Sequence, residues 1–160
     1  MLSPYLLREN DAYSYEFVTD TGIRYKVYFL DYSFMFQEYT NIHSPIFSFN
    51  IDAIEGDPDT VPGDERVGST IAHIMDLFFA TIDNVAVYVC DSLDQRQYAR
   101  KRKFDLWFHA YNNGSLMKED GVALVDGVEI LNAILLHKQH QQLQAILHAF
   151  RELNQQADHK

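Results

Sequence analysis

The stretch YSYEFVTDTGIRYKVYFL, residues 13–30, alternates aromatic and polar side chains on both sides of a short polar segment. Every second side chain of a β-strand points to the same face. Tyr15 and Phe17 therefore share one face, and Val27 and Phe29 share a face of the next run. The DTG segment between the two runs ends in Gly22 and is typical of a turn. This stretch predicts a β-hairpin.

The patterns that follow alternate between extended and helical. Segment 52–65 holds six acids, two prolines and two glycines, which predicts a loop. Two further strands are predicted at 46–51 and, buried, at 85–90. A helix with an apolar stripe from Ile71 to Ile82 lies between them, with Ser69 or Thr70 as its cap. A second helix at 93–111 starts with a Ser92–Gln95 capping box and ends before Asn113 and Gly114, and a C-terminal helix lies around 143–153.

Residues 116–137 fit two structures. Asp126 and Gly127 between apolar runs favour a hairpin, whereas the good helix formers after Val128 favour one long helix. We choose strands. The predicted order is then βββαβαββα, with a mostly antiparallel sheet and about three helices. Residues 1–160 are expected to form a single α+β domain.

The composition limits the classes of function. Hydrophobic residues make up 47% of the chain and charged residues 22%, as in ordinary globular proteins, while the net charge is −10. General nucleic-acid binding needs a cationic surface and is disfavoured, whereas a basic protein partner suits the charge. No apolar run reaches the roughly 18 residues of a membrane span, and the N-terminal run is too short for a signal peptide. Cys90 is the only cysteine, so no internal disulfide can form, and we expect a reducing cytoplasm.

The segment YVCDSLDQRQYARKRKF, residues 88–104, concentrates five cations. On the predicted helix, Arg96 and Arg100 stand in line with the apolar Phe104, so something outside the helix must neutralise them. Carboxylates of 52–65 or Asp91 would do so by ion pairing, for which arginine is well suited. A bound anion is the alternative, because a helix N-terminus after a strand favours anions.

The spacing of Cys90 and Arg96 matches the C-x5-R pattern of cysteine-dependent phosphatases. In that hypothesis Cys90 is the nucleophile, and Asp94 or Asp91 is the acid. Ser92, Arg96 and Arg100, with Asp91, are the candidate anion-binding residues. The segment lacks the glycines that let backbone amides surround a phosphate, and its carboxylates would repel one. A buried cysteine at a strand end is the competing explanation.

Other candidate sites are weaker. His137 and His140 have no further ligand at matching spacing, and the acids of 52–65 miss the EF-hand pattern. We therefore expect no metal and no cofactor. The four cations at 100–103 point in different directions around a helix, which favours a solvated face partly paired with Asp105 over a nucleic-acid site.

The element Y-x-C-D-S-x-D-x-R-Q-x-x-R resembles part of a small family of uncharacterised bacterial proteins, largely from Bacteroidota. Here it comprises Tyr88, Cys90, Asp91, Ser92, Asp94, Arg96, Gln97 and Arg100. The resemblance covers most of the chain, from the first hairpin to the C-terminal helix. It implies a complete cytoplasmic bacterial protein and supplies no activity.

These observations favour a non-enzymatic module that binds another macromolecule. The acidic charge suits a basic protein partner, as in antitoxin-like or immunity-like proteins, and the aromatic side chains would serve as anchors. The alternative is an anion-binding or phosphate-ester-processing enzyme centred on Cys90 and Arg96. The oligomeric state is not predicted.

Overall fold

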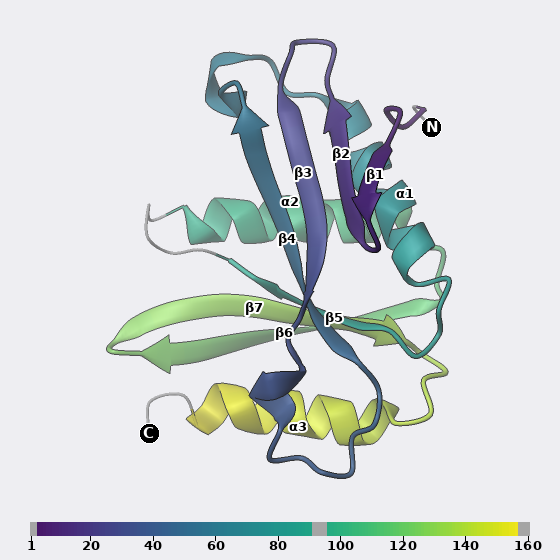
Figure 1. Ribbon diagram of the computed structural model, residues 1–160. Coiled ribbons are helices and arrows are strands. Elements are labelled where there is room, and N and C mark those ends of the chain that lie inside the picture. The colour runs from purple at the N-terminus through teal and green to yellow at the C-terminus, as the bar shows by residue number, and fades with distance from the viewer. Residues whose placement is uncertain (1–2, 91–95, 157–160) are drawn as a thin grey trace.

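A computed structural model describes residues 3–90 and 96–156 of the chain (Figure 1). Its strands form one seven-stranded sheet in the order β1-β2-β3-β4-β5-β7-β6. The strands are β1 (Arg8–Asp11), β2 (Ser14–Val18), β3 (Arg24–Asp31), β4 (Ile46–Glu55), β5 (Val85–Val89), β6 (Leu116–Val125) and β7 (Val128–His137). The helices in this part of the chain are α1 (Glu65–Phe78), α2 (Gln97–Tyr111) and α3 (Leu143–Gln156), with short 3-10 turns η1 (Ser33–Phe36) and η2 (Pro58–Thr60). Only β4 and β5 pair in parallel among these strands, so the predicted α+β class is confirmed.

Both predicted hairpins are present. In the first, Tyr15 pairs with Val27, and Gly22 supplies the positive φ of +85° that its turn requires. In the second, Asp126 and Gly127 have φ values of 52° and 76°. Two consecutive positive φ angles give the type I′ turn that joins two-residue hairpins. Residues 128–137 are therefore a strand, and the rival helix is excluded.

The helix around residue 71 begins earlier than predicted, and its cap was wrongly assigned. Asp64 is the N-cap, and its Oδ1 accepts a hydrogen bond from Arg66 N at 2.9 Å. Ser69 and Thr70 lie inside α1 and are buried. Ser69 lies on the side of α2, where its Oγ is 3.2 Å from the Tyr111 hydroxyl and Gly68 lies against the ring of Trp107, whereas Thr70 faces Tyr5. Ile82 falls beyond the end of α1 and is 57% exposed.

Two strand assignments also need correction. β1 was not predicted, because its four residues, REND, are polar and exposed and show no apolar alternation. The predicted loop at 52–65 begins too early, since β4 continues to Glu55. Its acidic end remains extended because β3 supplies backbone partners along its length, with Asp52 opposite Lys26 and Glu55 opposite Arg24.

The sheet separates two apolar layers. One lies under α1 and α2, where Phe78 stacks on Phe29 with ring centroids 3.9 Å apart and Phe104 stacks on Tyr88 at 4.3 Å. The other lies under α3 and η1 and includes Ile134 and Phe150. Figure 1 shows α2 and α3 on opposite sides of the β6–β7 hairpin.

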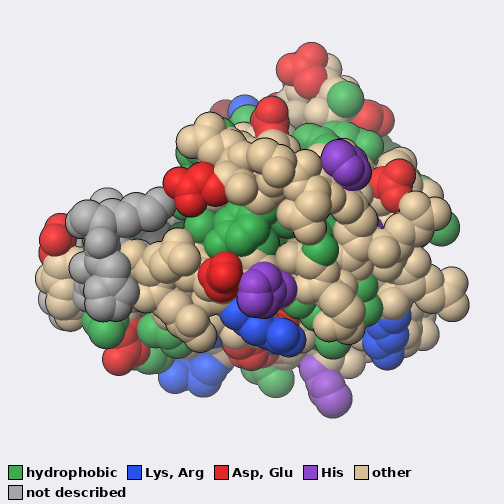
Figure 2. All heavy atoms as spheres, turned by 90° about the horizontal axis from the view of Figure 1, so that it is seen from below, with side chains coloured by type: hydrophobic (Ala, Val, Ile, Leu, Met, Phe, Trp, Pro, Cys, Tyr) green, Lys and Arg blue, Asp and Glu red, His purple; other side chains and the backbone are tan. Residues whose placement is uncertain are grey.

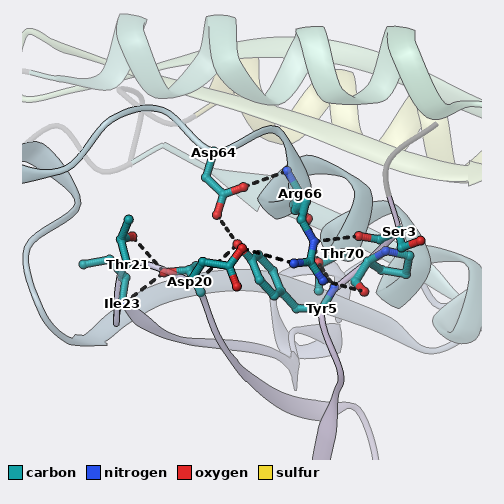
Figure 3. Close-up of polar contacts among 10 residues, drawn as sticks. Ser3, Tyr5, Asp20, Thr21, Ile23, Asp64, Arg66 and Thr70 are labelled. Carbon is teal, nitrogen blue, oxygen red and sulfur yellow. Dashed lines mark hydrogen bonds and ion pairs between the residues drawn. The ribbon is translucent and has the colours of Figure 1, made fainter.

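Residues near the N-terminus tie α1 to the first hairpin (Figure 3). The Tyr5 hydroxyl donates to the Asp64 carboxylate and accepts from Asp20 N at 3.2 Å. Arg66 lies 3.9 Å from the centroid of the Tyr5 ring and pairs with Asp20 at 3.3 Å. Tyr5 N donates to Thr70 Oγ1 at 2.8 Å. Burial and the Asp64 hydrogen bond raise the pKa of Tyr5, so its hydroxyl keeps its proton.

Tyr5→Phe should test this contact. The variant keeps the ring and removes the hydroxyl, so we expect a loss of about 1 kcal/mol in the free energy of unfolding, measured in urea. Tyr98→Phe is the matched control, because its ring is 51% exposed, and should change stability by less than about 0.5 kcal/mol. Equal stability of the two variants would contradict a stabilising role for the Tyr5 hydroxyl.

Candidate functional site

The predicted site residues separate into those that the structure places and those that it does not describe. Cys90 follows β5, its backbone N–H donates to Leu131 O at 2.9 Å, and its side chain is 1% exposed. Arg96 is the N-cap of α2, and Arg100 lies in the first turn of that helix. Asp91, Ser92 and Asp94 lie outside the described residues, as does the predicted capping box at 92–95. The end of the helix at Tyr111 is confirmed.

Arg96 forms a two-point ion pair with Asp59 from the segment between β4 and α1. Its Nη1 lies 2.7 Å from Asp59 Oδ2, and its Nη2 lies 3.2 Å from Oδ1. Both side chains are more than half exposed, so the pair is worth about 1 kcal/mol or less. The acidic segment thus supplies a carboxylate to Arg96, as the structural interpretation of this arginine requires.

The surroundings of Cys90 disfavour a thiolate. Burial raises the pKa of the Cys90 thiol, and this effect outweighs the opposing influence of Lys101, the Tyr88 hydrogen bond and Arg100. Burial and the neighbouring Cys90 also raise the pKa of Tyr88. A cysteine nucleophile needs the opposite shift, toward neutral pH or below. The catalytic role of Cys90, Asp94 and Arg96 therefore stays a prediction, and so does anion binding by Asp91, Ser92, Arg96 and Arg100.

A group of four charged side chains, which we call the Lys–Asp cluster, joins α2 to β6. It consists of Lys101 and Asp105 from α2 with Lys118 and Asp120 from β6. Lys101 Nζ lies 2.6 Å from Asp105 Oδ1 and 2.7 Å from Asp120 Oδ1. Lys118 Nζ lies 2.8 and 2.6 Å from the same two oxygens. Both lysine side chains are only 12% exposed, so removal of one carboxylate would leave two nearly buried cations.

The pKa shifts in the Lys–Asp cluster define the pH range in which it stabilises the fold. Burial opposes ionisation of Lys101, but hydrogen bonds to Asp105 and Asp120 prevail and raise its pKa. Burial likewise opposes ionisation of Asp120, but Lys101 and Lys118 prevail and lower its pKa. The stabilisation by Asp120 is present above the unfolded-state pKa of about 3.9 and is lost as the pH falls below it, and that by Lys101 is lost above about pH 10.4.

The end of the β6–β7 hairpin carries apolar side chains in contact with solvent. We define the hairpin end as Val122, Leu124, Val125 and Val128, which are between 42% and 49% exposed. Figure 1 shows the turn of this hairpin beyond the described ends of α2 and α3. β6 is an edge strand of the described sheet, so only β7 pairs with it. The hairpin end and the outer edge of β6 therefore combine exposed apolar surface with exposed backbone hydrogen-bonding groups.

Sequence reasoning found part of this arrangement. The pairing of a cation with Asp105 was predicted and is present as the contact of Lys101 with Asp105. The contribution of Lys118 and Asp120 was missed, because nothing in a sequence shows which helix covers an edge strand. The Asp126–Gly127 turn located the hairpin, and its flanking valines were the available signal for the hairpin end.

Comparison with known protein families gives one match. The model of DUF6169, described as a family of unknown function, matches residues 63–152, which is more than half of the chain. The chain belongs to DUF6169. The match spans α1, β5, α2, β6 and β7 and most of α3, so the Lys–Asp cluster and the hairpin end lie within the DUF6169 region. Membership of an uncharacterised family is thus confirmed, whereas a bacterial origin and the Cys90–Arg100 element as a family feature stay predictions.

No curated protein matches the chain. None of the helices described for this DUF6169 protein combines the length and apolar character of a membrane span. Within residues 3–90 and 96–156, no three histidine, cysteine, aspartate or glutamate side chains are grouped as a metal site would require.

The reactivity of Cys90 tests the catalytic hypothesis directly. Because its pKa is raised, we expect iodoacetamide to alkylate the folded protein at pH 7 at least tenfold more slowly than the urea-unfolded protein. The rate of the folded protein should still rise with pH where that of the unfolded protein has levelled off, and vanadate should not change it. A thiol that reacts rapidly at pH 7 and is protected by vanadate would instead support the phosphate-ester enzyme.

Asp120→Asn tests the Lys–Asp cluster. We expect the variant to lose about 1–2 kcal/mol of unfolding free energy at pH 7, a value that allows for the half-exposed carboxylate. The loss should shrink at pH 3, because Asp120 is then mostly protonated in the unfolded state of the wild-type protein. Its ionised form therefore stabilises the fold less than it does at pH 7. Urea unfolding at both pH values measures it, and Asp76→Asn, on the exposed side of α1, serves as the control. A loss of equal size at pH 3 would contradict an electrostatic origin.

Proposed function

We propose that this protein is a non-enzymatic binding module that takes up an extended segment of another protein along β6 and the hairpin end. The observation that carries the proposal is the group of four half-exposed apolar side chains on one edge hairpin. Apolar surface in contact with water costs about 25 cal/mol per Å², so exposed side chains of this kind favour a partner that covers them.

The free edge of β6 supplies the second half of the argument. An added strand would pair with the outward-facing N–H and C=O groups of β6, and its side chains would contact alternate positions on the two faces. Val122 and Leu124 lie on the face that carries Asp120 and α2, whereas Val125 lies on the α3 face. A bound strand would thus meet apolar side chains on both faces.

The charges on β6 do not oppose such pairing. Charged side chains usually protect an exposed edge, because an approaching strand would have to bury them. Here Lys118 and Asp120 are paired within the Lys–Asp cluster, and Glu119 accepts from Arg151 Nε at 2.7 Å. The charges of β6 are therefore balanced by neighbours on α2 and α3, and strand addition would leave these pairs in place.

The chemistry of the partner follows from the net charge of −10. A protein of this charge attracts basic partners and repels acidic ones, which speeds encounter with a basic protein at low ionic strength. Antitoxin-like and immunity-like proteins act in this way on basic targets. We therefore propose a basic protein partner whose binding weakens as salt is raised.

Site-specific crosslinking tests this proposal. A photoreactive phenylalanine derivative at position 124 should crosslink a basic protein in cells, and Leu124→Lys should lower recovery of that protein at least tenfold. Ile54 on β4 is the matched control for both changes, since it is 46% exposed against 45% for Leu124. Equal crosslinking from both positions, or none, would overturn the proposal. Light scattering would identify the remaining case, in which the chain pairs with a second copy of itself and forms a dimer.

A further inference from the structure

One face of β1–β4, which we call the open face, carries Glu16, Lys26 and Asp52, and no described helix covers it. α1 and α2 pack on the opposite face with Tyr15 and Val27, and Figure 1 shows α2 behind β3 and β4. α3 contacts β6 and β7 instead. Seen from below, the α3 side has hydrophobic side chains near its middle, but their arrangement does not identify an occupant (Figure 2). The open face differs, because its charges follow a definite order.

Four charged side chains cross the open face in a line, which we call the charged row. The strand register pairs Arg8 with Glu16, Glu16 with Lys26, and Lys26 with Asp52, one residue from each of β1 to β4. Side chains paired in this way point to the same side of a sheet, with Cβ atoms about 5 Å apart. The signs therefore alternate along the row, starting with a positive charge at the edge strand.

The charges of the row are not neutralised within the chain. Opposite charges on neighbouring strands commonly pair, yet among the described residues none of the four takes part in an ion pair. The Glu16 carboxylate accepts from the Asn10 amide, and the Asp52 carboxylate accepts from the Tyr28 hydroxyl at 2.7 Å. Lys26 Nζ lies 4.9 Å from the centroid of the Tyr28 ring. None of the four residues is buried, so their charges are accessible to a partner.

We propose that the open face binds the open face of a second copy of this chain and forms a two-fold dimer. A two-fold axis parallel to the strands, between β2 and β3, reverses the order of the charged row in the second copy. Arg8 then faces Asp52 of the second copy, and Glu16 faces its Lys26. Symmetry gives each contact twice, so every charge of the row meets an opposite charge. This surface goes beyond the proposed function and does not depend on it.

The order of the charges selects this occupant and this axis. A two-fold axis along the row would place each residue against its own copy, so like charges would face each other. A uniformly basic or acidic partner would match only two of the four charges. The reversed row of a second copy matches all of them.

Side chains beside the charged row support a close contact. Val18 and Leu30 lie on the open face by strand alternation and are 43% and 55% exposed. Val18 pairs in register with Arg24, so the same axis places it opposite the aliphatic stem of that arginine in the second copy. The Arg24 guanidinium is itself paired with Glu55 at 3.3 Å. Sheets that pack face to face, about 10 Å apart, bury such side chains between them.

The size of the open face and the net charge make this dimer weak. Four strands spaced about 4.8 Å apart give a face about 19 Å wide, which is small for a stable interface. The net charge of −10 on each copy also opposes association. Salt at about 0.15 M screens charges farther apart than about 8 Å, which removes most of the general repulsion but little of the attraction across the interface. We therefore expect reversible dimerisation as the protein concentration rises.

Charge reversal tests the proposal by sedimentation equilibrium of the full chain up to about 1 mM. Lys26→Glu and Glu16→Lys each place like charges across the interface, and each should weaken dimerisation at least tenfold. An equal mixture of the two variants should form a heterodimer, because each variant supplies the charge that the other lacks. The double variant Glu16→Lys/Lys26→Glu should regain its own dimer for the same reason. A monomeric wild-type chain, or a mixture no more associated than its components, would overturn the proposal.

Two control variants separate the charged row from other causes of association. Arg102→Glu changes the net charge as Lys26→Glu does, but it lies on the exposed side of α2 and should leave dimerisation unchanged. An equal effect of the two would assign the result to net charge and overturn the proposal. Leu124→Lys alters the hairpin end and should also leave the dimer intact. A dimer lost in Leu124→Lys and kept in Lys26→Glu would place self-association at the hairpin end and overturn it too. Circular dichroism checks that each variant is folded, and the double variant keeps opposite charges side by side on β2 and β3.

Discussion

Burial of β7 on both faces is the constraint on which the rest of the structure depends. Every side chain from Leu131 to Leu136 is buried, and the alternation of the strand sends Ala133 and Leu135 into one apolar layer and Ile134 and Leu136 into the other. A strand of this kind is stable only if something covers each face of the sheet. α2 covers one face and α3 the other, and β5 and β6 flank the strand in the sheet.

The attachment of α2 explains how a cation-rich helix can cover an apolar sheet in an acidic protein. α2 contributes Phe104 as its one fully buried residue in the described chain, with Trp107 and Phe108 partly buried against the same apolar layer. The Lys–Asp cluster adds charged hydrogen bonds between the helix and the edge strand, and Arg96 is tied to Asp59 at the N-terminal end. The basic segment is thus largely engaged within the chain, which leaves the acidic surface to determine the character of a partner.

The sequence predicted the elements whose signals come from residues close together in the chain. Alternation in 13–30 and the Asp126–Gly127 turn are local signals, and both hairpins followed from them. The cap at Asp64 and the cluster contacts of Asp120 were missed for a different reason. The Asp64 carboxylate also accepts from the Tyr5 hydroxyl, and the cluster joins Lys101 to Asp120, 19 positions along the chain, so both depend on contacts between residues distant in sequence. Local propensity does not encode such choices.

At the candidate site, too, local signals were read correctly and the consequences of packing were not. The spacing of Cys90 and Arg96 suggested a thiolate beside a cation, but spacing carries no information on burial, which raises the pKa of Cys90. An acidic partner for Arg96 was anticipated, because the carboxylates of 52–65 are abundant and any of them would serve. For the hairpin end the signal was weaker, because only the valines beside the Asp126–Gly127 turn marked it.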